Sequence, residues 1–435
     1  MRLLTAGSNE YGQLGRPTQL NRSCDFVAID ARVDIAVVSS GSWHTAAVTS
    51  TGELLLWGRN NYGQCGIPCA SFPVVMTPTQ LPLAHQICGV ACGHQHTVLL
   101  TTAGAVLTFG NNNYGQLGIG SFTSCSKPSE ARCPEDIQAV FSGPHTSYAV
   151  GSSGSVYAWG ETSFLLLSDI QSTGRSSLVP LPTALALGPF ERHIEKVVAG
   201  SHFALFVSTS GEVLGCGNND HGQLGVVDAR PHRLHLLAKG RTVRDIDVGF
   251  SHTALLAPDG RVSLCGSLKT SNEKVVGHRV PCELQRLDHI DGIGCGPSCV
   301  FGWNVSGCWA LGFNHDGMLG TGSFHHAADI PALVPLPWTA RVLQSSCGVS
   351  HTVLLISAEP RHRVEPPCLL NREQDEKFPL LNGEVMFSLS FSKNPSNMVS
   401  LDPFRNAKRI VLIVGVAIVH ILVRRYRSAI NQLSV

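Results

Sequence analysis

The chain has 435 residues, of which 43% are hydrophobic, and its formal net charge is +1 from 32 Lys+Arg and 31 Asp+Glu. The apolar share excludes a wholly disordered chain, and the near-zero charge excludes a strongly basic nucleic-acid binder. The 44 Gly and 24 Pro predict frequent turns and few long helices. Charge is uneven: residues after Ile356 carry 11 − 7 = +4, and the rest carry 21 − 24 = −3.

The chain opens directly on a folded pattern at residues 2–7, without the long apolar run of a secretory leader. Fifteen cysteines, an odd number, are therefore expected to be reduced thiols rather than a disulfide framework. The pairs Cys88/Cys92 and Cys295/Cys299 lack a second pair at zinc-finger spacing, so no structural zinc is expected. Gly292–Gly296 lacks the Lys-Ser/Thr ending of a phosphate loop. We expect no cofactor.

Two phrases recur along the chain. The first is a Gly-Gln-Leu-Gly loop, present at residues 11–15, 114–118 and 221–225, with Cys65 in the leucine place at 62–66 and a looser copy at 316–320. The second ends in His-Thr and centres on His44, His96, His252 and His351, with weaker copies at His145 and His202 and Cys299 in the remaining place. The steps between these places are 52, 49, 57, 50, 47 and 52 residues, which is a period near 51 seen seven times.

Short apolar runs flanked by turn residues lie between the phrases, as in residues 46–48 and 54–57 or 98–100 and 106–109. Such runs predict antiparallel hairpins. One unit of this size cannot bury its own faces, so the units must stack. The sequence therefore predicts an all-β, seven-bladed β-propeller over residues 1–357.

Closure of the ring is also predicted. The seventh unit ends on His351–Ile356 without its hairpin partner, because Pro360 follows, and Arg2–Gly7 is an orphan copy of that missing strand. Pairing of the two would leave no long exposed edge.

The two phrases closely resemble the repeats of the regulator of chromosome condensation family, whose fold is a seven-bladed propeller. WD repeats are shorter than 51 residues, and the double glycine of kelch repeats is not the recurring mark here. The resemblance implies guanine-nucleotide exchange on a small GTPase, because the best-known member acts on Ran. The competing hypothesis is a non-catalytic scaffold that binds a protein partner, and it is the one we favour. An enzyme that makes or breaks bonds is a distant third, and no direct nucleic-acid contact is expected.

The recurring histidines have two readings. They form a partner-binding ring, or each one ties a loop to a neighbouring carbonyl. The candidate binding residues of this group are His44, His96, His145, His202, His252 and His351. The packing hypothesis is favoured, because the residue recurs in six units whichever face it lies on.

The fourth unit departs from the pattern after Trp159. It continues Glu161-Thr162-Ser163-Phe164-Leu165-Leu166 and loses the Gly-Gln-Leu-Gly loop, as does the sixth unit at residues 266–270. Loops carry binding on rigid scaffolds, so Phe164, Leu165 and Leu166 are candidates for a partner-binding wedge, with simple drift as the alternative.

The C-terminal tail has a different character. Residues 358–408 read as a linker with a strand-like stretch at 385–391, and residues 409–427 hold a 14-residue apolar run between basic flanks. The run predicts a tail anchor in an intracellular membrane such as the mitochondrial outer membrane, although it is short for a span, and docking or disorder are the alternatives. A cytoplasmic protein is expected, with a nuclear one as the alternative. The proposed membrane residues are Ile410, Leu412, Val414, Val416, Ile418, Ile421 and Val423.

Overall fold

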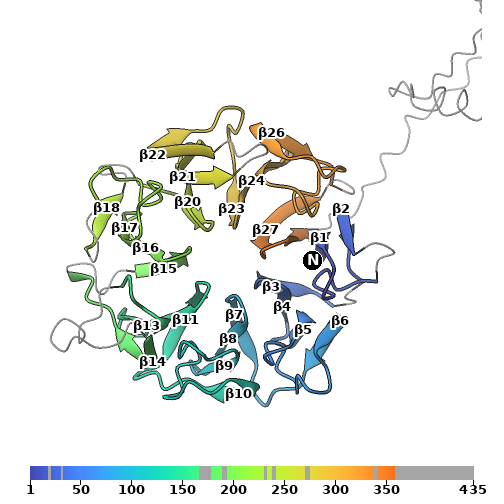
Figure 1. Ribbon diagram of the computed structural model, residues 1–435, viewed down its shortest axis with the longest axis vertical. Helices are drawn as coiled ribbons and strands as arrows, with labels where there is room; N and C mark the ends of the chain where they lie inside the picture. Colours follow the sequence, from blue (N-terminus) through green and yellow to red (C-terminus); the bar gives the residue numbers. More distant parts are fainter. Residues whose placement is uncertain are drawn as a thin grey trace, which may run out of the picture. The chain divides into compact units, whose positions relative to one another are not determined.

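The structure is a computed structural model that describes residues 1–17, 21–30, 33–165, 178–188, 194–229, 233–237, 242–269, 275–336 and 340–357. The described residues form seven four-stranded antiparallel sheets, arranged as blades around a central channel (Figure 1). The linker, the stretch at 385–391 and the apolar run at 410–423 lie outside the described residues. Within the described part, no helix has the length and apolarity to cross a membrane.

The blades are numbered here in chain order. Blade 1 contains β3 (Ile35–Ser40), β4 (His44–Thr49), β5 (Leu54–Arg59) and β6 (Val74–Leu81). Blade 2 contains β7 (Ile87–Cys92), β8 (His96–Thr101), β9 (Val106–Gly110) and β10 (Cys125–Glu130). Blade 3 contains β11 (Ile137–Ser142), β12 (Thr146–Gly151), β13 (Val156–Glu161) and β14 (Leu178–Ala184). Blade 4 contains β15 (Ile194–Ala199), β16 (Phe203–Ser208), β17 (Val213–Gly217) and β18 (His235–Leu237).

The remaining blades complete the ring. Blade 5 contains β19 (Asp245–Val248), β20 (His252–Leu256), β21 (Val262–Lys269) and β22 (Val275–Glu283). Blade 6 contains β23 (Gly292–Gly296), β24 (Cys299–Asn304), β25 (Gly307–Gly312) and β26 (Ala327–Val334). Blade 7 contains β27 (Arg341–Cys347), β28 (His351–Ser357), β1 (Arg2–Ser8) and β2 (Arg22–Ala28).

Blade 7 joins the two ends of the ring. β1 pairs with β28 in antiparallel register from Arg2↔Ile356 to Gly7↔His351, and β2 adds the outermost strand (Figure 1). The predicted number of blades and the predicted closure by the chain start are both confirmed. The pairing satisfies the edges of β28 and β1, so neither half of the blade is left as a template for another chain.

The hydrophobic core lies between blades rather than within one. The second strand of a blade is buried along its whole length, as in β4 and β8, whereas the innermost strands alternate between buried and accessible positions. One cluster joins Leu3 and Leu355 of blade 7, Trp57 of blade 1 and Phe109 of blade 2. Each blade therefore buries its apolar faces only against its neighbours, as the repeat argument requires.

The Gly-Gln-Leu-Gly phrase forms the loop between the third and fourth strands and packs onto the next blade. Gly115 in the blade 2 copy has φ +83°, and a Cβ at this residue would lie 2.8 Å from Cα of Pro180 in blade 3. Glycine alone suits both the left-handed backbone and the close approach. The phrase is conserved within the chain because it joins adjacent blades.

Candidate functional site

Three of the repeated histidines form buried bonds between blades. Nε2 of His44, His96 and His351 lies 3.0 Å from the hydroxyl of Thr97, Ser147 and Thr45, respectively, in the following blade. Each hydroxyl donates to the carbonyl of Gln64, Gln116 or Gln13 in the Gly-Gln-Leu-Gly loop. Because each hydroxyl donates its proton to a carbonyl, it can only accept from the histidine. The histidine must therefore carry a proton on Nε2 and donate it to the hydroxyl oxygen.

Burial sets the charge state of these three histidines. All three rings are 0% exposed, and burial lowers the pKa of His44, His96 and His351 to about 3. The rings are neutral at physiological pH and present no surface to a partner. The packing hypothesis holds for them, with one amendment: the histidine reaches the neighbouring carbonyl through a hydroxyl rather than directly.

His252 shows what happens when the next blade lacks the hydroxyl. It begins β20 in the same place as His44, but the corresponding residue of blade 6 is Val300. Neither ring nitrogen of His252 has a hydrogen-bond partner in the described part of the chain. Burial lowers the pKa of His252 to about 4, and the backbone of Cys299, which lies near the ring without meeting hydrogen-bond geometry, opposes this shift.

His145 and His202 do not belong to this ring. β12 begins at Thr146 and β16 begins at Phe203, so these two residues occupy the histidine place and the two histidines lie one position earlier. There they sit in the turn between the first and second strands, where His145 is half-buried and His202 is exposed. Their inclusion in the histidine ring was wrong, because one residue of slip moves a side chain from the core to the surface.

Loss of the loop phrase in one blade coincides with loss, in the next blade, of the hydroxyl that follows the histidine place. Blades 3 and 5 lack the Gly-Gln-Leu-Gly loop, and the following blades 4 and 6 begin their second strand with Phe203-Ala204 and Cys299-Val300 instead of His-Thr. Without the glutamine carbonyl, a buried threonine hydroxyl would lose its acceptor, which is costly. At the histidine place, blades 3 and 5 therefore meet the next blade through apolar packing.

The first-to-second turns and the third-to-fourth loops lie at one end of every blade, because consecutive strands are antiparallel. We call this end the loop face and the opposite end the turn face. Aromatic rings meet across the seams on the loop face. Tyr11 contacts Trp43 with centroids 6.2 Å apart, and the Arg59 guanidinium lies 4.7 Å and 5.0 Å from the centroids of these two rings.

The same pairing recurs at two further seams. Tyr114 stacks on His145 with centroids 4.4 Å apart, and Phe164 meets His202 edge-on at 6.2 Å. His202 Nδ1 also lies 3.5 Å from Glu161. These residues run over the loop face from blade 7 to blade 4 and are called the aromatic arc: Tyr11, Trp43, Arg59, Tyr114, His145, Phe164 and His202.

The three residues of the predicted wedge separate in the structure. Phe164 stands at the place of Tyr114 and makes the equivalent seam contact. Leu165 stands at the place of Gly115, is 7% exposed and packs in the cluster between blades 3 and 4. Leu166 lies outside the described residues. Partner contact through Phe164 stays a prediction, and Leu165 has little surface to offer.

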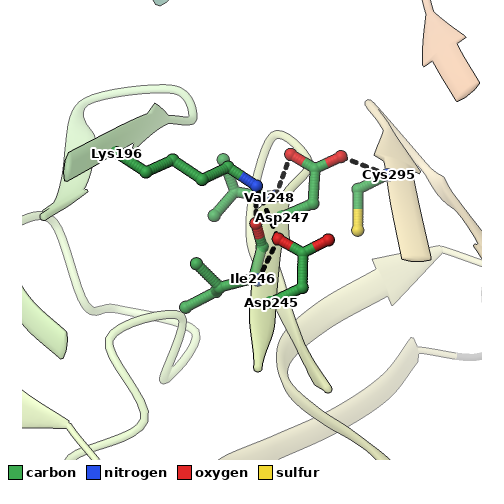
Figure 2. Close-up of polar contacts among 6 residues, drawn as sticks. All are labelled: Lys196, Asp245, Ile246, Asp247, Val248 and Cys295. Atoms are coloured by element: carbon green, nitrogen blue, oxygen red, sulfur yellow. Dashed lines mark hydrogen bonds and ion pairs between the residues drawn. The ribbon is translucent and has the colours of Figure 1, made fainter. Parts of the chain in front are cut away.

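Side chains also bond the innermost strands to one another around the channel. Ser39 of blade 1 accepts from the amide of Cys92 in blade 2 at 3.0 Å, and Ser346 of blade 7 accepts from the amide of Ser40 in blade 1 at 2.8 Å. Asp247 of blade 5 occupies the same register place and accepts from the amide of Cys295 in blade 6 at 2.7 Å (Figure 2). The Asp247 carboxylate thus accepts the inter-blade hydrogen bond that a serine hydroxyl accepts in blades 1 and 7.

A lysine completes the charged version of this bond. Lys196 Nζ of blade 4 lies 2.7 Å from Asp245 Oδ1 and donates to the Ile246 carbonyl at 2.9 Å (Figure 2). Gln344 of blade 7 makes the equivalent bond to the Val38 carbonyl. The two carboxylates raise the pKa of Lys196 against the effect of its burial, whereas burial raises the pKa of Asp247. We call Lys196, Asp245 and Asp247 the charged clasp. Sequence reasoning missed it, although Asp247 aligns with Ser39 and Ser346 in the repeat.

The channel itself is a cavity of about 490 Å³ lined by the innermost strands and their turns. On the loop face, His94 of blade 2 meets Phe250 of blade 5 across the ring, with centroids 5.8 Å apart. Burial and the neighbouring His145 lower the pKa of His94 to about 4. The contact narrows the channel at the loop face.

The cysteines are placed by the repeat. The described cysteines are free thiols, and burial raises the pKa of Cys92 and Cys216 to about 12, which makes them poor nucleophiles. No group of three or more His, Cys, Asp or Glu side chains in the described ranges has the arrangement to hold a metal ion. Gly292–Gly296, the segment tested as a phosphate loop, is β23.

Comparison with known proteins agrees with this architecture. The family model described as RCC1-like domain matches residues 2–354, so the chain belongs to that family. It is 29% identical over 417 residues to a mouse (Mus musculus) secretion-regulating guanine nucleotide exchange factor, covering 84% of this chain and 85% of the relative. It is 25% identical over 380 residues to a regulator of chromosome condensation from Xenopus laevis, covering 81% and 89%. The crystal structure of human WBSCR16 superposes with a TM-score of 0.70 at 23% identity, covering 82% of this chain and 100% of that one, which supports the fold.

Proposed function

We propose that this member of the RCC1-like domain family is a protein-binding propeller that engages its partner through the aromatic arc on the loop face. The observation that supports this is the set of partly exposed aromatic and arginine side chains at the seams. Trp, Tyr and Arg dominate the energetics of protein interfaces. The place of Trp43 is held by Gln95 in blade 2 and Ser251 in blade 5, so ring closure does not require an aromatic residue there.

The rigid scaffold suits this role. The loops that carry Tyr11 and Tyr114 are held by buried bonds, from the Leu14 amide to Asn9 at 3.0 Å and from the Leu117 amide to Asn112 at 2.9 Å. A surface that is ordered before binding loses little conformational entropy when it binds.

The test uses the full-length chain and two single variants. Trp43→Ala truncates the arc, and Val305→Ala truncates a side chain that is 79% exposed in the turn between β24 and β25 on the opposite face. Affinity capture with quantitative mass spectrometry identifies a partner, and its purified form is then titrated against all three proteins. We expect Trp43→Ala to weaken binding by a factor of ten or more and Val305→Ala to leave it unchanged. Equal affinity for all three proteins would reject the arc as the interface.

Guanine-nucleotide exchange on a small GTPase is the second candidate, favoured by the similarity to a secretion-regulating exchange factor along most of both chains. An exchange factor needs no bond chemistry, because it binds the nucleotide-free GTPase more tightly than the loaded one. A panel of small GTPases, Ran among them, loaded with a fluorescent GDP analogue separates the two hypotheses. Accelerated release that Trp43→Ala abolishes would establish exchange through the arc. Binding without acceleration would establish the scaffold.

Attachment to an intracellular membrane through residues 410–423 also stays a proposal, supported by the apolar run and its basic flanks. Cell fractionation of the full chain and of a chain ending at Arg409 tests it. Membrane recovery that is unchanged by the truncation would reject the anchor.

A further inference from the structure

The central channel has the dimensions of a ligand site. Its volume of about 490 Å³ lies within the range of roughly 300–1,000 Å³ typical of small-molecule pockets. Its walls combine apolar side chains, among them Val38, Val90, Trp303 and Leu343, with a few polar groups. The His94–Phe250 contact narrows the channel at the loop face, so we take the turn face as the entrance.

The lining of the channel holds one more carboxyl group than it holds ammonium groups. The charged residues among its described lining are Lys196, Asp245 and Asp247, which sum to 1 − 2 = −1. His94 is neutral at physiological pH, because burial lowers its pKa to about 4. Lys196 is already held by Asp245 and the Ile246 carbonyl. A negative charge in a narrow cavity with low-dielectric walls concentrates cations.

The inter-blade bond does not need this charge. Ser39 and Ser346 make the same bond with an uncharged hydroxyl. A carboxylate at position 247 adds a desolvation cost that the fold avoids at two other seams. The excess charge is therefore available for another task.

The loop-face end of the same cavity holds two polar groups without a hydrogen-bond partner among the described residues. Ser42 lines the cavity, is 3% exposed, and its hydroxyl has no partner in the described residues. Nε2 of His94, which also lines the cavity, is likewise buried without a partner. Buried polar groups in proteins are normally paired, and unpaired ones call for an explanation such as an absent water or ligand.

We propose that the channel binds a linear organic cation, an alkylammonium or guanidinium group on an aliphatic stem, which enters from the turn face. The cationic head lies against the carboxylates of Asp245 and Asp247, and the stem lies along the apolar wall formed by Leu343 and its neighbours. A lysine or arginine side chain of a partner protein and a free polyamine share this chemistry. An anion is excluded as the ligand, because the one lysine is already paired.

The experiment is calorimetric titration of the full chain with three probes: spermidine, a short lysine-containing peptide, and an uncharged diol of similar length. We expect saturable 1:1 binding of a cationic probe and none of the diol. Binding of spermidine but not the peptide would identify a free polyamine, and the reverse would identify a partner side chain. Failure of both cations to bind would overturn the proposal.

Two matched variants locate the site. Asp247→Ser removes the charge but keeps the bond to Cys295, as Ser39 and Ser346 do, and is expected to weaken cation binding at least tenfold. Leu343→Lys places a cation on the wall at a side chain that is 40% exposed, and is expected to abolish binding, whereas Leu343→Met retains it. Unchanged affinity in both Asp247→Ser and Leu343→Lys would show that the cation binds elsewhere. None of these residues belongs to the aromatic arc, so the outcome is independent of the proposed function.

Discussion

The histidine place allows one substitution to be compared in two environments. His44 and His252 begin the second strands of blades 1 and 5, and both are 0% exposed. His44 donates to Thr97, whereas His252 faces Val300 and has two unpartnered ring nitrogens. We expect His252→Phe to stabilise the protein and His44→Phe to destabilise it.

The magnitudes follow from the bonds. A buried polar group without a partner costs about 1–3 kcal/mol, so replacing His252 by an apolar ring recovers part of that sum. The larger phenyl ring offsets some of the gain, although Phe203 shows that this place accepts it in blade 4. We expect a net gain of about 1 kcal/mol. His44→Phe loses the bond to Thr97, and the larger phenyl ring offsets the relief gained by removing the one unpartnered nitrogen, Nδ1, so a net loss of about 1 kcal/mol is expected.

The assay is urea unfolding of both variants, followed by tryptophan fluorescence and circular dichroism, with midpoints compared at constant slope. Trp57 and Trp159 are fully buried between blades and report on the seams. If His252→Phe destabilised the protein as much as His44→Phe, the reasoning from the hydroxyl of the next blade would be refuted.

The remaining predictions concern acid, the charged clasp and the loop glycine. The four histidines that begin a second strand, His44, His96, His252 and His351, have folded pKa values of about 3 or 4, below the unfolded value of 6.5. Their contribution to stability is therefore full above pH 6.5 and falls as pH decreases, by roughly 1.4 kcal/mol per pH unit for each histidine. Thermal melts from pH 7 to pH 4 check this, and a flat profile would contradict the burial. Lys196→Met should lower the free energy of unfolding by about 1–2 kcal/mol, a value reduced for the partial exposure of Lys196, because it leaves two carboxylates facing the channel without a cation. Lys196→Gln, which mimics Gln344, should cost less. Equal melting temperatures of the two variants would refute the stabilising role of the charged clasp. Gly115→Ala should cost at least about 1 kcal/mol in urea unfolding, because an alanine resists positive φ and lacks space against Pro180, whereas Ala103→Gly in an exposed turn should change stability little.

The periodic sequence determined most of the architecture by itself. Six steps near 51 residues between seven places required seven units, and the orphan strand at residues 2–7 required closure with residues 351–356. These features can be predicted from the sequence because each unit repeats the same local pattern of strands and glycine turns. Each of these glycines is required by the conformation of its own backbone. Glycine therefore recurs at the same place in every unit that keeps the loop, and the sequence alone reveals it.

Contacts across the seams depended on the tertiary structure. A shift of one residue along the repeat decides whether a histidine is a buried hydrogen-bond donor or a residue of the surface turn. The sequence pattern does not resolve such a shift, so it predicted the wrong place for His145 and His202. The partner of His351 is Thr45, 306 residues away, and the contact of His94 with Phe250 spans the ring. The charged clasp joins three blades through side chains that no repeat phrase contains. Such interactions join residues that lie far apart in the sequence. They depend on which blades are neighbours or lie opposite one another, and only the closed ring sets that arrangement.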